Sequence, residues 1–164
     1  MKILDILLRD AVLVDLKATG KREVLEEICA AVAAAEPAAD RAKLVEVLSE
    51  RERLQSTGIG EGVAIPHGKI PGLPRLVAAF AKSRGGVDFD SVDGQKTHLF
   101  FLLVMPENAG GQHLKALARI SRSLRDPAFR RAFCSARRCV CWGGGAAGSR
   151  TPGGGIGLRT RGAC

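Results

Sequence analysis

Aromatic side chains are scarce in this chain of 164 residues, which has no tyrosine, one tryptophan and six phenylalanines. Phe80, Phe100 and Phe101 stand in apolar runs, and none of the six stands directly between two basic residues, so no platform for stacking nucleic-acid bases is visible. The formal net charge is +8, but residues 135–164 carry five arginines and no acid, which leaves +3 for residues 1–134. We therefore expect the main part of the chain to bind no nucleic acid.

Long hydrophobic runs are also missing. The longest strongly apolar run, Leu99–Met105, is far shorter than the roughly 20 residues that a membrane span needs. The N-terminal stretch MKILDILLRD carries charges throughout and does not resemble a signal peptide. We expect no membrane insertion and a cytoplasmic location.

Several familiar site motifs are absent. The glycines of GIGEG, residues 58–62, alternate and match neither GxGxxG nor a P-loop. Cys139 and Cys141 are separated by one residue, whereas zinc ligand pairs have two to four between them. The three histidines, His67, His98 and His113, show no metal-ligand spacing, and no nucleophile elbow is present. We expect neither a metal nor a cofactor, and we interpret His98, within an apolar run, as structural.

Helical patterns are clear in four places. Apolar residues recur at helical spacing over about 21–35, and Asp40 is a candidate N-cap for a second helix reaching Leu54. A third helix begins near Gly110-Gly111, and Asp126-Pro127 starts a final one. The residues expected to face inward are Val24, Leu25, Ile28 and Val32 in the first helix, Leu44, Val47, Leu48 and Leu54 in the second, and Leu114, Leu117, Ala118 and Leu124 in the third.

Strand patterns alternate with these helices. A short strand is expected at Val12–Leu16, after one or two helical turns. The nearly continuous apolar runs Leu76–Ala81 and His98–Met105 are typical of strands buried on both faces. Alternation at Val87–Asp90 and the turn signal Asp93-Gly94 predict a hairpin between them. The order predicts an α/β (α+β) fold, with a mixed β-sheet packed between helices in one domain over residues 1–134.

The last thirty residues follow a different composition. Residues 135–164 are rich in Gly, Arg and Cys and lack periodicity, so we expect an atypical, largely disordered tail.

His67 lies in the segment GIGEGVAIPHGKI, residues 58–70, between a proline and a glycine. An imidazole nitrogen accepts a phosphoryl group when the other nitrogen is held in one tautomer by a hydrogen bond. A bound phosphoryl group also needs donors and positive charge, which Arg51, Arg53 and Lys69 would supply. Pro66 would stiffen the approach, and Gly68 would leave room for a partner protein.

The surrounding spacing resembles a known family. Glu52, six residues, Ile59-Gly60, two residues and VAIPHG at 63–68 are similar to the phosphohistidine signature of the fructose/mannitol-type EIIA domains of the bacterial phosphotransferase system. The longer stretch RERLQSTGIGEGVAIPHGKIPG resembles most closely the nitrogen-regulatory branch of that family. The similarity in layout extends from about Lys2 to Ala132. Family members continue with a further helix, whereas this chain departs near Cys134, which suggests a diverged end or a shifted reading frame.

The resemblance implies residue roles and partners. His67 matches the phosphoryl acceptor, and His113 matches a second histidine at a helix start that would hydrogen-bond a phosphoryl oxygen. Arg51, Ser56 and Thr57 match positions at the rim of the site, with Lys69 beside them. The implied partners are a phosphorylated HPr-like carrier protein (NPr type) and regulatory targets such as sensor kinases or potassium transporters; no cofactor is implied.

Three alternatives remain open at this stage. The chain would instead pass phosphate to an EIIB for fructose or mannitol uptake, act as a binding module that is never phosphorylated, or bind nucleic acid through its basic tail. The sequence does not choose among regulatory targets or set the oligomeric state.

Overall fold

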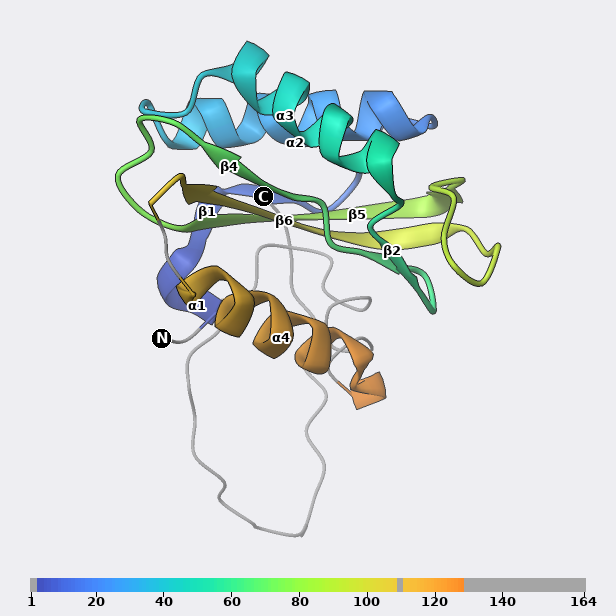
Figure 1. The fold of residues 1–164 in the computed structure, drawn as a ribbon. Coiled ribbons are helices and arrows are strands. Elements are labelled where there is room, and N and C mark those ends of the chain that lie inside the picture. Colours follow the sequence, from blue (N-terminus) through green and yellow to red (C-terminus); the bar gives the residue numbers. More distant parts are fainter. Residues whose placement is uncertain (1–2, 109–110, 129–164) are drawn as a thin grey trace, which may run out of the picture.

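The computed structural model describes residues 3–108 and 111–128, and for Leu4, Gln112 and His113 it describes the backbone alone. The described elements form three layers, with a β-sheet between two layers of helices (Figure 1). The expected α/β fold of one domain, with a mixed sheet packed between helices, is confirmed. The expectations for residues 135–164 lie outside the described residues.

The elements follow one another closely along the chain. They are α1 (Ile3–Ile6), β1 (Leu7–Leu13), α2 (Lys21–Ala35), α3 (Arg41–Leu54), β2 (Gly58–Gly60), β3 (Val63–Ala64), β4 (His67–Ile70), β5 (Val77–Val87), β6 (Thr97–Pro106) and α4 (Gln112–Arg125).

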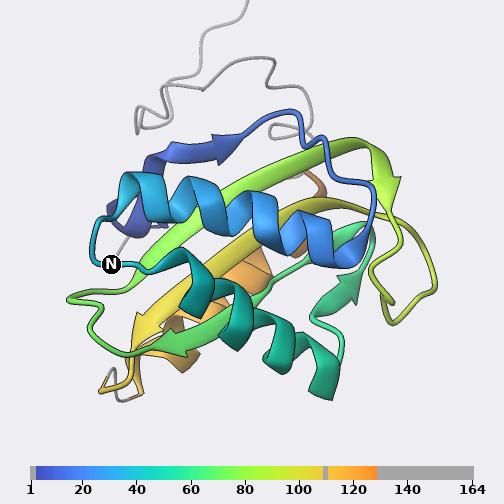
Figure 2. The same cartoon turned by 90° about the horizontal axis from the view of Figure 1, so that it is seen from above.

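The sheet is built around the antiparallel pair β5 and β6. On one side β1 runs parallel to β5, and on the other side β3 and β4 both run parallel to β6. The short strand β2 pairs antiparallel with β3, which gives the order β1-β5-β6-β3-β2 with β4 beside β6. Figure 2 shows α2 and α3 lying side by side over one face of this sheet.

Each face of the sheet carries its own apolar core, because successive side chains of a strand point to opposite faces. In β6, Phe100, Leu102 and Val104 pack toward α2 and α3, whereas Leu99, Phe101, Leu103 and Met105 pack toward α4 and Ile6. The seven residues Leu99–Met105 are each at most 3% exposed. The expected strand buried on both faces is therefore confirmed.

The helices on the first face match their sequence patterns. α2 occupies the predicted range, and Val24, Leu25, Ile28 and Val32 are buried as expected. Asp40 caps α3, since its Oδ1 accepts from Lys43 N at 2.7 Å. The expectation that Leu54 faces inward is wrong, because Leu54 ends α3 and is 73% exposed.

The inward face of α4 differs from the predicted one. Its buried residues are Ala116, Ile120 and Leu124, which form one row at spacings of four. Leu114 is 63% exposed and Ala118 is also exposed, so only Leu124 and the partly buried Leu117 were assigned correctly. Asp126 accepts from Ala128 N at 2.9 Å, as expected of a cap, and the rest of the predicted final helix lies outside the described residues.

The strands differ from the predicted ones in two places. The first strand is Leu7–Leu13 and not Val12–Leu16, because it pairs with β5 and begins directly after α1. The glycine-rich stretch 58–62, for which we predicted no strand, forms a tight hairpin between β2 and β3, with Gly60, Glu61 and Gly62 at positive φ. The predicted hairpin around Asp93-Gly94 is present and joins β5 to β6 through residues 88–96.

Candidate functional site

The strands β3 and β4 behave as one strand interrupted at Ile65-Pro66. Val63 pairs with Leu99 and His67 pairs with Leu103, so both strands keep the same register along β6. Proline has no N–H to donate, which explains the interruption. The Pro66 carbonyl still accepts from Leu103 N at 2.9 Å, so the chain stays attached to β6 immediately before His67.

This register decides which way the imidazole points. Side chains of paired residues in parallel strands lie on the same face, and Leu103 and Met105 belong to the core under α4. His67 and Lys69 therefore project to the α4 side of the sheet, and Gly68 and Ile70 to the side of α2 and α3. His67 is half-buried and Lys69 is exposed.

Gly68 allows α3 to lie directly on β4. A Cβ at this position would stand 2.9 Å from Val47 Cγ1 and 3.3 Å from Leu48 Cδ2, both on α3. Gly68 was expected to leave room for a partner protein, but in the structure it leaves room for α3. The close approach of α3 fixes the strand that carries His67.

The ring of His67 is held in one tautomer. Its Nδ1 lies 2.8 Å from the carbonyl oxygen of Ile65. Because a carbonyl oxygen only accepts hydrogen bonds, Nδ1 carries the proton in this contact. In the neutral ring Nε2 then bears the lone pair, which makes Nε2 the nucleophilic nitrogen.

The backbone of His113 stands in the first turn of α4, on the face of the sheet toward which His67 points. The parallel strands β4 and β6 end on the same side of the molecule, where Figure 1 shows α4 beginning. The side chain of His113 lies outside the described residues, so its predicted hydrogen bond to a phosphoryl oxygen stays a prediction.

The other residues predicted for the rim occupy different environments. Arg51, in the last turn of α3, donates from Nη1 to the Gln55 carbonyl at 2.9 Å. Ser56 is half-buried and donates from Oγ to the Phe89 carbonyl at 2.8 Å. Thr57 is 5% exposed, and its hydroxyl donates to Glu52. Contact of these residues and of Lys69 with a phosphoryl group stays a prediction.

Glu52 is the centre of a buried polar cluster beside this segment. Its carboxylate accepts from Thr57 N at 3.0 and 3.1 Å and from the Thr57 hydroxyl, and it lies 3.0 Å from Lys21 Nζ. Lys21 Nζ also lies 2.8 Å from Asp90 Oδ2 and over the ring of Phe89. Burial lowers the pKa of Lys21, but the hydrogen bonds and negative charges of Asp90 and Glu52 outweigh it and raise that pKa overall.

Lys21 and Asp90 were not expected from the sequence to take part in this cluster. They are 69 positions apart and meet only because α2 and the 88–96 segment fold against the end of α3. Glu52 and Thr57 stood in the sequence motif, but Lys21 and Asp90 did not.

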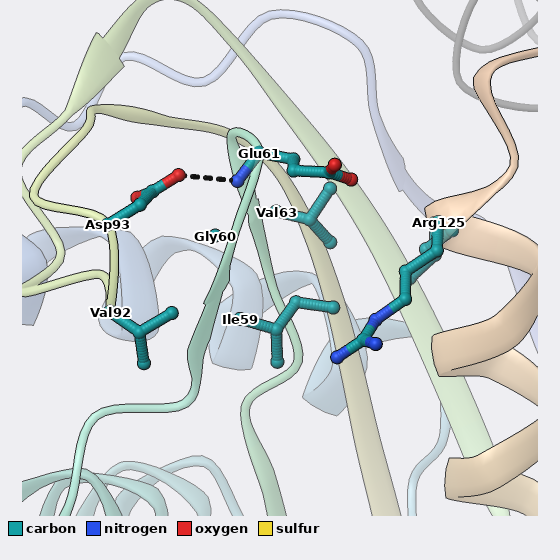
Figure 3. A pocket seen from close by; sticks show the side chains of 8 residues that line it. Ile59, Gly60, Glu61, Val63, Val92, Asp93 and Arg125 are labelled. Atoms are coloured by element: carbon teal, nitrogen blue, oxygen red, sulfur yellow. Dashed lines mark hydrogen bonds between the residues drawn. The ribbon is translucent and has the colours of Figure 1, made fainter.

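Residues 88–96 also hold the hairpin of β2 and β3. Asp93 Oδ2 accepts from Glu61 N at 2.7 Å (Figure 3). Ser91 Oγ accepts from Gly60 N at 3.1 Å. The backbone hydrogen bonds from Glu61 and Gln95 lower the pKa of Asp93. A cavity of about 350 Å³ lies between this hairpin and the last turn of α4, lined by Ile59, Gly60, Glu61, Val63, Val92, Asp93, Leu124 and Arg125.

His98, which we interpreted from the sequence as structural, contacts the backbone of the neighbouring strand. It is half-buried in β6, and its Nδ1 lies 3.1 Å from the Ser83 carbonyl oxygen. Within the part of the chain that the structure describes, no three His, Cys, Asp or Glu side chains gather as metal ligands. Over the same residues, no helix is long and apolar enough to cross a bilayer.

The fold and the His67 segment define a phosphotransferase-system EIIA domain, and the comparisons agree. The family described as "Phosphoenolpyruvate-dependent sugar phosphotransferase system, EIIA 2" matches residues 5–138, and the chain belongs to this family. It is 48% identical over 126 residues to a nitrogen regulatory protein of Bradyrhizobium diazoefficiens, covering 77% of this chain and 82% of that protein.

The chain is also similar to sugar-specific and to nitrogen-regulatory members of the family. The chain is 36% identical over 136 residues to the fructose-specific EIIABC component of Bacillus subtilis, covering 83% of this chain and 21% of that longer protein. Nitrogen regulatory protein IIA-Ntr of Neisseria meningitidis superposes with a TM-score of 0.76 at 33% identity, covering 82% of this chain and 92% of the other. The mannitol IIA of Escherichia coli shares the fold, with a TM-score of 0.66 at 18% identity and coverage of 79% and 90%. The chain is thus an EIIA domain similar to the nitrogen regulatory proteins.

Proposed function

We propose that this protein carries a phosphoryl group on Nε2 of His67, receives it from a phosphorylated HPr-like carrier, and regulates partners through its phosphorylation state. The observation that carries the proposal is the 2.8 Å contact between His67 Nδ1 and the Ile65 carbonyl, which leaves the lone pair on Nε2. Membership of the EIIA family supports the same chemistry.

The transfer of the phosphoryl group between two histidines needs no cofactor. The Nε2 lone pair attacks the phosphorus of a donor phosphohistidine, a new N–P bond forms, and the N–P bond of the donor breaks. The donor nitrogen recovers its electron pair, and the Nδ1 proton of His67 stays in place. Positive charge that develops on the ring is stabilised by the hydrogen bond from Nδ1 to the Ile65 carbonyl.

Phosphorylation changes the charge of one surface position. A phosphoryl group adds close to two negative charges, and it would stand on the same face of β4 as the exposed Lys69. Such a change recruits or repels a partner surface by local electrostatics. We propose that the partners are regulatory proteins in the cytoplasm, because nitrogen regulatory proteins are among the relatives with high identity.

The test is intact-protein mass spectrometry after incubation with phosphoenolpyruvate, Enzyme I and an HPr-like carrier at alkaline pH. The wild type should gain one phosphoryl group, and His67→Ala should gain none. His98→Gln is the matched control and should gain the group normally, since His98 contacts the Ser83 carbonyl and not the site. A folded wild type that gains nothing would leave the protein as a binding module without phosphorylation.

A second candidate function is phosphate transfer to an EIIB during sugar uptake. The 36% identity to a fructose-specific EIIABC component favours it. Incubating the phosphorylated protein with isolated fructose and mannitol EIIB domains separates the two functions. Rapid loss of the label to an EIIB would support sugar transport, and retention of the label would support regulation.

A further inference from the structure

We propose that Glu52 and Thr57 are positioning residues for His67, acting through the backbone of Ile65 to hold the imidazole as the Nδ1–H tautomer. The inference deepens the function proposed above and rests on it for its catalytic meaning. The contacts themselves form an unbroken series from a buried carboxylate to the ring.

The series begins at Glu52, whose side chain is 4% exposed. A buried carboxylate must have its lone pairs occupied, because leaving them unpaired costs several kcal/mol. Here both oxygens accept from Thr57 N, Oε2 accepts from the Thr57 hydroxyl, and Oε1 faces the Lys21 ammonium. Thr57 is therefore held at its N–H and its hydroxyl together.

The next contact leads from Thr57 to the His67 strand. The Thr57 carbonyl accepts from Ile65 N at 3.0 Å. On the far side of the next peptide, the Pro66 carbonyl accepts from Leu103 N at 2.9 Å. The peptide between Ile65 and Pro66 has no N–H of its own, so these two flanking bonds hold it.

The carbonyl of that peptide is the one that His67 Nδ1 contacts. Proline at 66 also restricts the residue before it to extended conformations, which limits the directions open to the Ile65 carbonyl. Movement of Thr57 would release Ile65 N and tilt this carbonyl away from Nδ1. The proton would then distribute between the two ring nitrogens, and the fraction of molecules with a nucleophilic Nε2 would fall.

The decisive variants are Thr57→Val and Glu52→Gln in the full chain. Thr57→Val keeps the shape and the backbone N–H but removes the hydroxyl, and Glu52→Gln keeps the shape but removes the charge. Long-range ¹H–¹⁵N spectra report the tautomer ratio of His67 directly, at a pH above about 8 where an ordinary histidine ring is neutral. We expect the ratio of the Nδ1–H to the Nε2–H form to fall roughly three- to tenfold in both variants, the effect of weakening one hydrogen bond.

Matched controls separate positioning from general damage. Thr97→Val makes the same change at a buried hydroxyl that has no hydrogen-bond partner among the described residues, and it should leave the ratio unchanged. Glu36→Gln removes a buried carboxylate paired with Arg75 at 2.9 Å, outside the series, and should also leave it unchanged. Thr57→Ser restores the hydroxyl and should restore the ratio.

The outcomes decide the proposal independently of phosphorylation. An unchanged ratio in folded Thr57→Val and Glu52→Gln would overturn the positioning role, even if His67 is phosphorylated normally. If either variant does not fold, the through-hydrogen-bond coupling between Ile65 N and the Thr57 carbonyl carbon is measured in the wild type instead. Absence of that coupling would overturn the proposal. A wild type that shows the tautomer but accepts no phosphoryl group would contradict the proposed function instead.

Discussion

Gly68 of β4 lies directly beneath Val47 of α3, so closely that a Cβ on Gly68 would stand 2.9 Å from Val47 Cγ1. Gly68→Ala should therefore force α3 away from the strand or distort it. We expect a loss of about 1–3 kcal/mol in the free energy of unfolding, the usual cost of overpacking. Urea denaturation followed by circular dichroism measures it.

The control for Gly68→Ala is Gly85→Ala. Gly85 also lies in a strand, but an added Cβ there meets nothing within 4 Å. We expect a far smaller change. Adding Val47→Ala to Gly68→Ala should recover part of the loss, and equal losses for Gly68→Ala and Gly85→Ala would contradict the packing argument.

Lys21 neutralises the buried carboxylate of Glu52 at 3.0 Å. Lys21→Met should leave that carboxylate without its cation and destabilise the protein by about 1–3 kcal/mol at pH 8. The double variant Lys21→Met with Glu52→Gln should lose less than the sum of the two single changes. Additive losses in urea denaturation would show that the two side chains do not stabilise each other.

We expect Asp93 to make the stability of the protein depend on pH in the acid range. Its pKa is lowered by the backbone hydrogen bonds from Glu61 and Gln95, so the folded protein binds this proton less readily than the unfolded chain. Its contribution to stability is present above the ordinary value of 3.8 and is lost as the pH falls through the folded value. Asp93→Asn should be less stable than the wild type at pH 7.

The stability difference between wild type and Asp93→Asn should begin to shrink below about pH 4, where Asp93 binds a proton in the unfolded chain before it does so in the folded protein. Parallel urea titrations from pH 7 to pH 3 measure this. A difference that stays constant down to pH 3 would mean that the charge of Asp93 contributes nothing.

Cys29 should be inert while the protein is folded. It is 0% exposed, and burial raises the pKa of its thiol to about 12. Since the thiolate is the reactive form, iodoacetamide at pH 8 should leave Cys29 unlabelled until urea unfolds the chain. Peptide mass spectrometry distinguishes Cys29 from the four later cysteines, and labelling in native buffer would show that the core opens around α2.

The local parts of the fold could be predicted from the sequence because their causes are local. The range of α2 follows from apolar residues at helical spacing, and the start of α3 follows from the cap at Asp40. The inward face of α4 was mistaken because Leu114 looks like a core residue by type, although the row Ala116, Ile120 and Leu124 is the one that meets the sheet. The size of the side chains alone does not indicate which face of α4 packs against the sheet.

The site was predictable only as far as its motif extends. The residues around His67 and the family resemblance indicate it as the phosphoryl acceptor, and this role stays a prediction. The buried position of Thr57 and its hydrogen bonds to Glu52 depend on how α3 ends. The meeting of Lys21 with Asp90 depends on two segments far apart in the chain. Such contacts arise from tertiary packing and leave no periodic pattern in the sequence.

The shared register of β3 and β4 along β6 makes the length of this segment as important as its composition. Deleting or inserting one residue between Ala64 and His67 would turn the imidazole from the α4 side of the sheet to the α3 side, because side chains alternate along a strand. After an insertion it would take the position of Gly68 and meet Val47 and Leu48. We therefore expect substitutions at Ile65 to be tolerated far more readily than any change in the number of residues between Ala64 and His67.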